Sequence, residues 1–147
     1  MSVLISGPPD AIRGSKLDVA RLRRQGQRIL SALGEDLSEL SIALVDDPQI
    51  KQLNGRWRDR HQSTDVLSFS QIEGDFSDHR DKMLGDVVIS VETAASQATA
   101  RHRGLDEVVT KLLIHGVLHL IGHDHEQDEE ALRMGAEERR VWRELGA

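Results

Sequence analysis

The hydrophobic pattern is densest over residues 106–121, towards the C-terminal end of the chain. Val, Leu and Ile positions there place apolar groups around nearly the whole circumference of an α-helix, and a helix that is apolar on all sides is buried inside a domain. Gly122 follows, and glycine adopts the left-handed conformation that ends a helix at no side-chain cost. The pattern therefore predicts a central buried helix with a sharp turn at its C-terminal end.

Other hydrophobic segments predict a mixture of strands and helices. Short apolar runs predict strands over residues 2–6, 41–45, 65–69 and 84–90. Apolar positions at helical spacing predict helices over residues 15–33 before Gly34, over 47–57, from Ser90 to Gly104, and over 128–145. The polar, glycine-containing segment 71–82 predicts a loop between two of the strands.

Capping side chains mark where three of these helices begin. Ser15 is the expected N-cap of the first helix, with Asp18 three positions later as a shorter relative of the capping-box residue. Asp47 is the expected cap of the second helix, because Pro48 suits the first helical position. Ser90 is expected to cap the helix that follows the last strand.

The predicted order is strand, helix, strand, helix, strand, strand and three helices. This order favours a single α+β domain over residues 1–147, in which a small four-stranded mixed sheet is packed with about five helices. A chain of 147 residues is long enough for one hydrophobic core, and it contains no repeat, low-complexity segment or linker. The pattern leaves the order of the strands open.

The composition is 38% hydrophobic and 30% charged, with a formal net charge of −6, which argues against a protein that coats nucleic acid indiscriminately. Arginines are nevertheless concentrated in residues 13–28 and 56–60. Those of the first predicted helix form either a solvated face or a patch for an anionic partner. No apolar run approaches the roughly 20 residues of a membrane span, and the N-terminus lacks the basic leader of a signal peptide. A cytoplasmic protein is the simplest expectation.

Four of the seven histidines lie between residues 115 and 125, and cysteine is absent. His115 and His119 are spaced i, i+4, which places both imidazoles on one face of a helix, within reach of one metal ion. The turn at Gly122 would return a third histidine to that face. His125 is the candidate because of its offset from the helix end, and His123 is the competitor. Three imidazoles with one open position are typical of a catalytic zinc site.

Other interpretations of these histidines explain less. A tag would not alternate with Val, Leu and Ile, and an ordinary core histidine would not share a helical face with a second one. The spacing H-x-x-x-H-x-x-G-x-x-H is also that of the long zinc-protease motif, in which a Glu general base follows the first histidine. This chain has Gly116 at that position, and glycine cannot accept a proton, so the motif argues against peptide hydrolysis.

Three blocks of the sequence occur together, and in the same order, in one known family. They are Leu53-Asn54 with Trp57-Arg58 and Thr64 to Phe69, then Leu84 to Ser90, then the run from His115 to His125. The last block resembles the signature H-G-x-L-H-L-x-G-x-D-H of the YbeY family, the bacterial ribosomal-RNA maturation endoribonucleases. The resemblance covers about residues 40 to 145. Ser63 and Ser70 stand where many members have proline, which concerns the stiffness of loops.

The resemblance implies one zinc ion bound by His115, His119 and His125, with His123 at a variable position of the family. It implies a role in activity for Arg58, whose planar guanidinium can bind two phosphate oxygens at once; a surface ion pair is the alternative for this residue. It further implies cleavage of single-stranded RNA, maturation of the 3′ end of small-subunit ribosomal RNA, ribosome quality control, and small-subunit proteins as partners.

The resulting hypothesis is a zinc-dependent, single-strand-specific endoribonuclease, in which zinc polarises a phosphoryl oxygen or lowers the pKa of its bound water to about 7. The sequence does not identify the general base. Asp124 and Glu126 lie beside the expected ligands but could instead hold an imidazole tautomer, Asp65 and Asp86 are alternatives at strand ends, and the 2′-hydroxyl of the RNA could itself attack. The competing classes are a ribosome-assembly factor with a structural metal and a metalloprotease.

Overall fold

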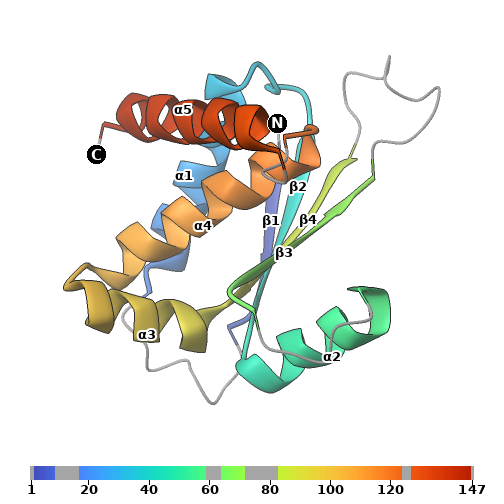
Figure 1. Cartoon of the computed structure of the whole chain (residues 1–147), viewed down its shortest axis with the longest axis vertical. Helices are drawn as coiled ribbons and strands as arrows, with labels where there is room; N and C mark the ends of the chain where they lie inside the picture. The colour runs from blue at the N-terminus through green and yellow to red at the C-terminus, as the bar shows by residue number, and fades with distance from the viewer. Residues whose placement is uncertain (1, 9–16, 59–63, 72–82, 124–126, 147) are drawn as a thin grey trace.

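The computed structural model of the chain describes residues 2–8, 17–58, 64–71, 83–123 and 127–146. Its elements, in chain order, are β1 (Ser2–Ser6), α1 (Val19–Ala32), β2 (Glu39–Val45), α2 (Asp47–Arg58), β3 (Val66–Ser70), β4 (Met83–Ser90), α3 (Val91–Arg101), α4 (Leu105–Leu120) and α5 (Asp128–Glu144) (Figure 1). The order of strands and helices predicted from the hydrophobic pattern is confirmed. The predicted loop over residues 71–82 lies, apart from Gln71, outside the described residues.

The strands form one mixed sheet in the order β1-β2-β4-β3. Strands β1, β2 and β4 are parallel, and β3 pairs antiparallel with β4. The predicted α+β fold with a four-stranded mixed sheet is therefore confirmed, and the strand order that the sequence left open places β3 at an edge, where it also contacts α4.

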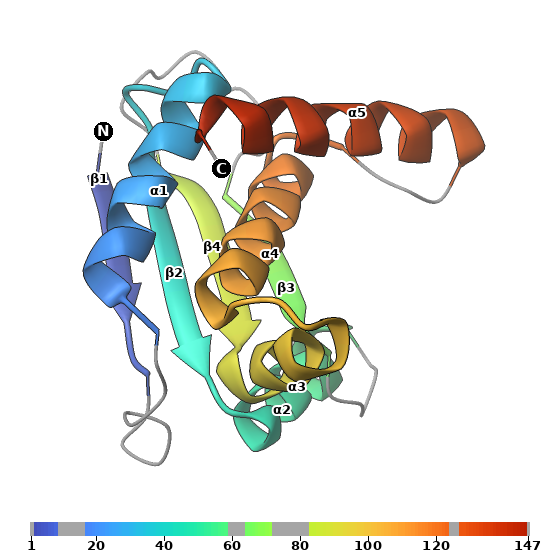
Figure 2. The same ribbon diagram turned by 90° about the vertical axis from the view of Figure 1, so that its left-hand side faces the viewer.

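Helices α1 and α4 lie against one face of the sheet, and α5 crosses near their ends and contacts both (Figures 1 and 2). The core fills the space between this helical layer and the sheet, where Ile29, Ile42, Val87, Leu113 and Val117 are completely buried. Helix α4 is thus the central buried helix that the hydrophobic pattern predicts. No helix in the described part of the chain has both the length and the apolar character needed to cross a membrane.

The N-caps of the first two helices differ from the predicted residues. Asp18, rather than Ser15, is the N-cap of α1, because its side chain accepts a hydrogen bond from the amide three residues later. Before α2, the Gln49 amide donates to Asp46 Oδ1 at 2.9 Å, and the Asp46 amide donates to Gln49 Oε1 at 3.1 Å. This reciprocal pair is a capping box, so Asp46 caps α2 and Asp47 lies inside its first turn.

The boundary between α3 and α4 also differs from the prediction. Ser90 caps α3 as expected, since its hydroxyl accepts a hydrogen bond from the Thr93 amide at 3.2 Å. Helix α3 ends at His102, which adopts the left-handed conformation with φ 54°, whereas Gly104 is the N-cap of α4. The predicted end of α3 at Gly104 was wrong, because that glycine begins the next helix.

Candidate metal centre

The last two turns of α4 bring His115 and His119 together. Their Nε2 atoms lie 3.2 Å apart, and the ring centroids are 4.7 Å apart with an angle of 75° between the ring planes. Both side chains are half-buried. The i, i+4 spacing therefore produces the shared face that the sequence predicts, with the Nε2 atoms of the two rings next to each other.

Contacts between α4 and the edge strand β3 hold the histidine-bearing turns in place. The Ser68 hydroxyl donates to the Gly116 carbonyl at 2.9 Å, and the Ser70 hydroxyl donates to the Leu120 carbonyl at 3.4 Å. A Cβ on residue 116 would lie 2.6 Å from Cγ1 of Val87 on β4, closer than real Cβ atoms approach. Gly116 therefore lets α4 approach the sheet closely, in the same two turns of the helix that contain the histidines.

The turn predicted after α4 is confirmed. Gly122 has φ 105°, its amide donates to the His119 carbonyl at 3.1 Å, and the His123 amide donates to the Leu118 carbonyl at 3.0 Å. These two bonds form a Schellman motif, which reverses the chain at the end of a helix. His123 is half-buried beyond the turn. His125, with Asp124 and Glu126, lies outside the described residues, so the third ligand stays a prediction.

The separation of the two Nε2 atoms can be compared with that of zinc ligands. Two imidazole nitrogens at 2.0–2.1 Å from a tetrahedral zinc ion are about 3.3–3.4 Å apart, close to the 3.2 Å found here. No group of three His, Asp or Glu side chains that could hold a metal occurs within the described ranges. The His115–His119 pair thus fits two positions of a zinc site, and further ligands have to come from elsewhere.

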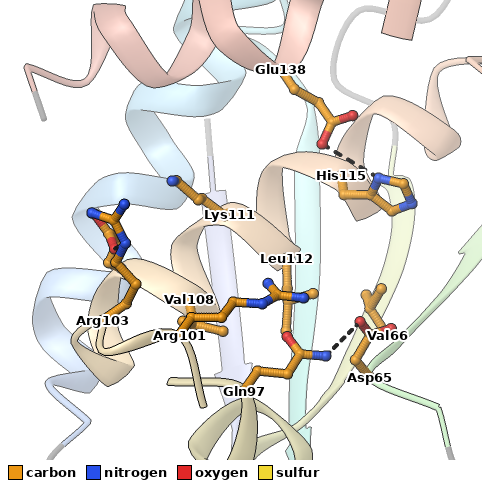
Figure 3. Close-up of a pocket in the computed structure, with 11 residues that line it drawn as sticks. Asp65, Val66, Gln97, Arg101, Arg103, Val108, Lys111, Leu112, His115 and Glu138 are labelled. Carbon is orange, nitrogen blue, oxygen red and sulfur yellow. Dashed lines mark hydrogen bonds and ion pairs between the residues drawn. The ribbon is translucent and has the colours of Figure 1, made fainter. Parts of the chain in front are cut away.

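A cavity of about 570 Å³ opens beside His115, between α3, α4, α5 and the start of β3 (Figure 3). Its lining residues are Asp65, Val66, Gln97, Arg101, Arg103, Glu107, Val108, Lys111, Leu112, His115 and Glu138. Asp65, one of the predicted candidates for the base, thus shares a cavity with His115. Its Oδ2 accepts a hydrogen bond of 3.0 Å from Gln97 Nε2, which holds the carboxylate against α3.

The positively charged side chains that line the cavity differ in their partners. Arg103 pairs with Glu107 at 3.8 Å, on the neighbouring turn. Lys111 Nζ lies 4.8 Å from the centroid of the Trp142 ring, in a cation–π contact. Within the described ranges, no carboxylate is at ion-pair distance from Arg101 or Lys111. Two cations beside the histidine pair are therefore left without an acidic partner in that part of the chain.

Of the other predicted site residues, Asp86 does not line this cavity. Val87 faces Gly116 of α4, and successive side chains of a strand point to opposite faces, so Asp86 points away from α4. Its Oδ2 instead accepts a hydrogen bond of 3.3 Å from Gln71 Nε2. Arg58 is the last residue of α2, and its side chain lies outside the description, so its predicted role stays a prediction.

One acidic residue of the site was missed in the sequence. Glu138 of α5 places Oε2 3.5 Å from Nδ1 of His115 (Figure 3). The sequence does contain a signal for it, because Glu138 falls on the same stripe of α5 as Met134 and Val141, which are buried. A carboxylate on the face of a helix that packs on the core needs a partner, and that partner is the histidine.

The fold and the histidine pair define a class: an α+β protein whose central helix, closed by a glycine turn, presents an H-x-x-x-H pair beside a cavity. Comparison with known families gives the particular one. The family model described as Endoribonuclease YbeY matches residues 12–146. The chain belongs to the endoribonuclease YbeY family, which confirms the resemblance found in its sequence.

Curated relatives and a solved structure agree with this assignment. The chain is 41% identical over 143 residues to the Endoribonuclease YbeY of Anaeromyxobacter dehalogenans, an alignment that covers 97% of this chain and 70% of that protein. It is 40% identical over 132 residues to the Endoribonuclease YbeY of Geobacter metallireducens, with 88% of each covered. The solution structure of TM1509 from Thermotoga maritima is similar with a TM-score of 0.60 and 26% identity, over 97% of this chain and 91% of that one.

Proposed function

We propose that this protein is a zinc-dependent, single-strand-specific endoribonuclease that matures the 3′ end of small-subunit ribosomal RNA and takes part in ribosome quality control. It would act in the cytoplasm, and proteins of the small ribosomal subunit would be its partners. The observation that supports the proposal most is the 3.2 Å separation of the His115 and His119 Nε2 atoms beside a cavity, in a chain whose relatives are named endoribonucleases.

His115 and His119, together with His125, would hold the metal. When bound, zinc supplies a Lewis acid that stabilises the negative charge developing on a phosphoryl group. The protein's own part is to fix the imidazoles. It does so by burying α4 and by donating the Ser68 and Ser70 hydroxyls to carbonyls of the turns that contain them.

The cavity beside His115 is the proposed path of the RNA. Arg101 and Lys111 line it without a described acidic partner, and cations of this kind bind the phosphates of a single strand without reading its sequence. Its volume of about 570 Å³ is within the range of ligand pockets, roughly 300–1,000 Å³. Arg58 is proposed to neutralise charge on the phosphate at which the strand is cut.

Asp65 is the proposed general base. Of the acidic candidates found in the sequence, it is the one that the described residues place in the cavity of His115. Gln97 Nε2 donates to one oxygen of its carboxylate and so orients the other. Asp65 would take a proton either from water or from the 2′-hydroxyl of the RNA. If the 2′-oxygen attacks the phosphorus, the bond to the 5′-oxygen breaks, and the products are a 2′,3′-cyclic phosphate and a 5′-hydroxyl end that takes its proton from water.

The structure also shows where the general base of a zinc protease would lie in this fold. Those enzymes need a Glu immediately after the first histidine. In this fold that position faces the sheet, and the Cβ of any side chain at residue 116 would meet Val87 at 2.6 Å. A carboxylate there would be directed into the packed contact with Val87 and Ser68, so the geometry argues against peptide hydrolysis by that mechanism.

A single substitution tests the proposal. His115→Ala should lose both the bound zinc and the cleavage of a single-stranded RNA, while the wild-type protein should contain close to one zinc per chain. The matched control is His102→Asn, which removes an exposed imidazole at the end of α3 and supplies a residue tolerated in the left-handed conformation. Full cleavage by a zinc-free His115→Ala protein would disprove the site.

A further inference from the structure

The side of the His115 ring that faces away from His119 meets a carboxylate from another helix. Oε2 of Glu138 lies 3.5 Å from Nδ1 of His115, and the two side chains are 36% and 29% exposed. Figure 3 shows Glu138 reaching down from α5 to the ring, which lies at the edge of the cavity. The pair is therefore partly shielded from solvent and joins α5 to the histidine-bearing turns of α4.

The two nitrogens of this ring have different neighbours, and that difference determines where its proton belongs. Nε2 faces Nε2 of His119 at 3.2 Å, so it is the nitrogen available to a shared metal. A neutral imidazole has one N–H, and the nitrogen that binds a metal must offer a lone pair. The proton must then be on Nδ1, which is where the carboxylate of Glu138 can accept it.

We infer that Glu138 is a positioning residue for the metal centre: it holds the proton of His115 on Nδ1 and so presents the Nε2 lone pair towards His119. This inference rests on the proposed zinc site. Ligating histidines commonly donate their other N–H to a carboxylate, which fixes the tautomer and the ring orientation. Glu138 is not a candidate base, because it faces the nitrogen on the far side of the ring from the metal position.

The packing of α5 holds Glu138 at this place. Met134, one turn before it, and Val141, one turn after it, are both buried, so Glu138 lies on the face of α5 that packs on the protein. The neighbouring Glu137 has a different partner, since its Oε2 accepts a hydrogen bond of 2.8 Å from Arg140 Nη2. Two adjacent carboxylates of equal charge thus have separate roles, which provides a matched pair for experiment.

The metal-free protein should already show the effect. With Nδ1–H directed at Glu138, Nε2 of His115 accepts a hydrogen bond from the Nε2–H of His119 across the 3.2 Å separation. Without the carboxylate this preference is lost, and the Nε2–H form of His115 becomes populated. Ring-nitrogen NMR on the metal-free protein, at a pH where the rings are neutral, distinguishes the two tautomers.

The test uses Glu138→Ala and Glu138→Gln, with Glu137→Gln as the control, and zinc alone as the probe. Competition with a chelator should show zinc binding weakened roughly 10- to 100-fold in Glu138→Ala, less in Glu138→Gln, whose amide oxygen can still accept, and unchanged in Glu137→Gln. NMR should show His115 moving from the Nδ1–H towards the Nε2–H form in the same order. Helical content measured by circular dichroism controls for folding.

The outcomes separate this inference from the proposed function. If the wild-type protein binds no zinc, the proposed zinc site fails, while the tautomer of His115 still tests the contact with Glu138. If the wild-type protein binds zinc but both Glu138 variants bind it equally well and keep the Nδ1–H tautomer, the positioning role is overturned and the zinc site stands. Should Glu138→Ala not fold, Glu138→Gln, which keeps the shape of the side chain, decides the matter.

Discussion

Gly116 packs directly on Val87, so closely that a Cβ at residue 116 would lie 2.6 Å from Val87 Cγ1 and 3.2 Å from Ser68 Oγ. The absence of a side chain at this position is what brings the histidine-bearing turns onto the sheet. The same contact removes the space in which the general base of a zinc protease would lie. One residue thus sets the position of the histidine-bearing helix and excludes the carboxylate that a zinc protease would need there.

Gly116→Ala should therefore destabilise the protein. Forcing a methyl group into this packed contact costs about 1–3 kcal/mol, which exceeds the gain of up to about 1 kcal/mol that alanine brings to a helix. Gly135→Ala in α5 is the control, because there a Cβ meets only the flexible end of Arg139, at 3.4 Å. Urea denaturation should show opposite signs for the two variants, and a stabilised Gly116→Ala protein would contradict the packing.

The two cations of the cavity should contribute to RNA binding and not to metal binding. Arg101→Glu and Lys111→Glu should each weaken binding of a single-stranded RNA and reduce the slope of log K against log salt by roughly 1. Zinc content should not change. Arg23→Glu on α1 is the charge-matched control, because this exposed residue does not line the cavity. Equal effects of all three variants would mean that only the overall charge matters.

Asp65 and Asp86, the two aspartates proposed as candidate bases from the sequence, should behave differently. Asp65→Asn should reduce the turnover number by roughly 10²- to 10⁴-fold if Asp65 is the general base, with zinc content unchanged, because the residue lines the cavity of His115. Asp86→Asn should have little effect on turnover, because Asp86 points to the other face of the sheet. A substrate with a single 2′-deoxy sugar at the cleavage site distinguishes the two nucleophiles. Cleavage of this substrate should persist if water attacks and should stop if the 2′-hydroxyl attacks.

The Glu137–Arg140 pair predicts a pH-dependent contribution to stability. The hydrogen bond from Arg140 holds the pKa of Glu137 below its ordinary value of 4.5, with a smaller opposing effect of burial. A lowered folded-state pKa contributes stability that is complete above the unfolded pKa and is lost as the pH falls through the folded one. Since the pair is about one-third exposed, its contribution should be only about 0.2–1 kcal/mol.

Glu137→Gln measures this contribution. The free energy of unfolding of the variant should be lower than that of the wild type at pH 7, and the difference should shrink to nothing as the pH falls below the range of the Glu137 pKa. The Arg140 guanidinium, whose pKa is raised by the same hydrogen bond, stays charged throughout this range. A difference that stays constant from pH 7 to acid would show that the carboxylate charge is not involved.

The central helix and its glycine turn were predictable because they depend on local rules. The apolar circumference of residues 106–121, the i, i+4 histidines and the conformational freedom of Gly122 are all contained in one short segment. The helix ends were less predictable. Asp46 competes with Asp47 for the cap of α2, and His102 ends α3 in a conformation for which glycine is the usual signal.

The parts of the site that could not be predicted depend on long-range packing. The stripe of α5 that contains Glu138 indicates that this carboxylate has a partner, but His115 is that partner only because α5 folds back across α4. The sequence presents Asp65 and Asp86 as equivalent candidates at strand ends, whereas Asp65 precedes β3 and Asp86 lies inside β4. They differ in the direction of their side chains, because Asp86 points to the face of the sheet away from α4. That direction depends on how the strands pair and pack on α4, which the hydrophobic pattern does not predict.

Removing and restoring zinc tests the central proposal most directly. The wild-type protein, stripped by a chelator, should remain folded by circular dichroism, lose cleavage of single-stranded RNA, and regain it when about one equivalent of zinc is added. Cleavage that persists without metal would contradict a zinc-dependent enzyme. A protein that unfolds when stripped, and cleaves no RNA even when loaded with zinc, would instead be a binding factor with a structural metal.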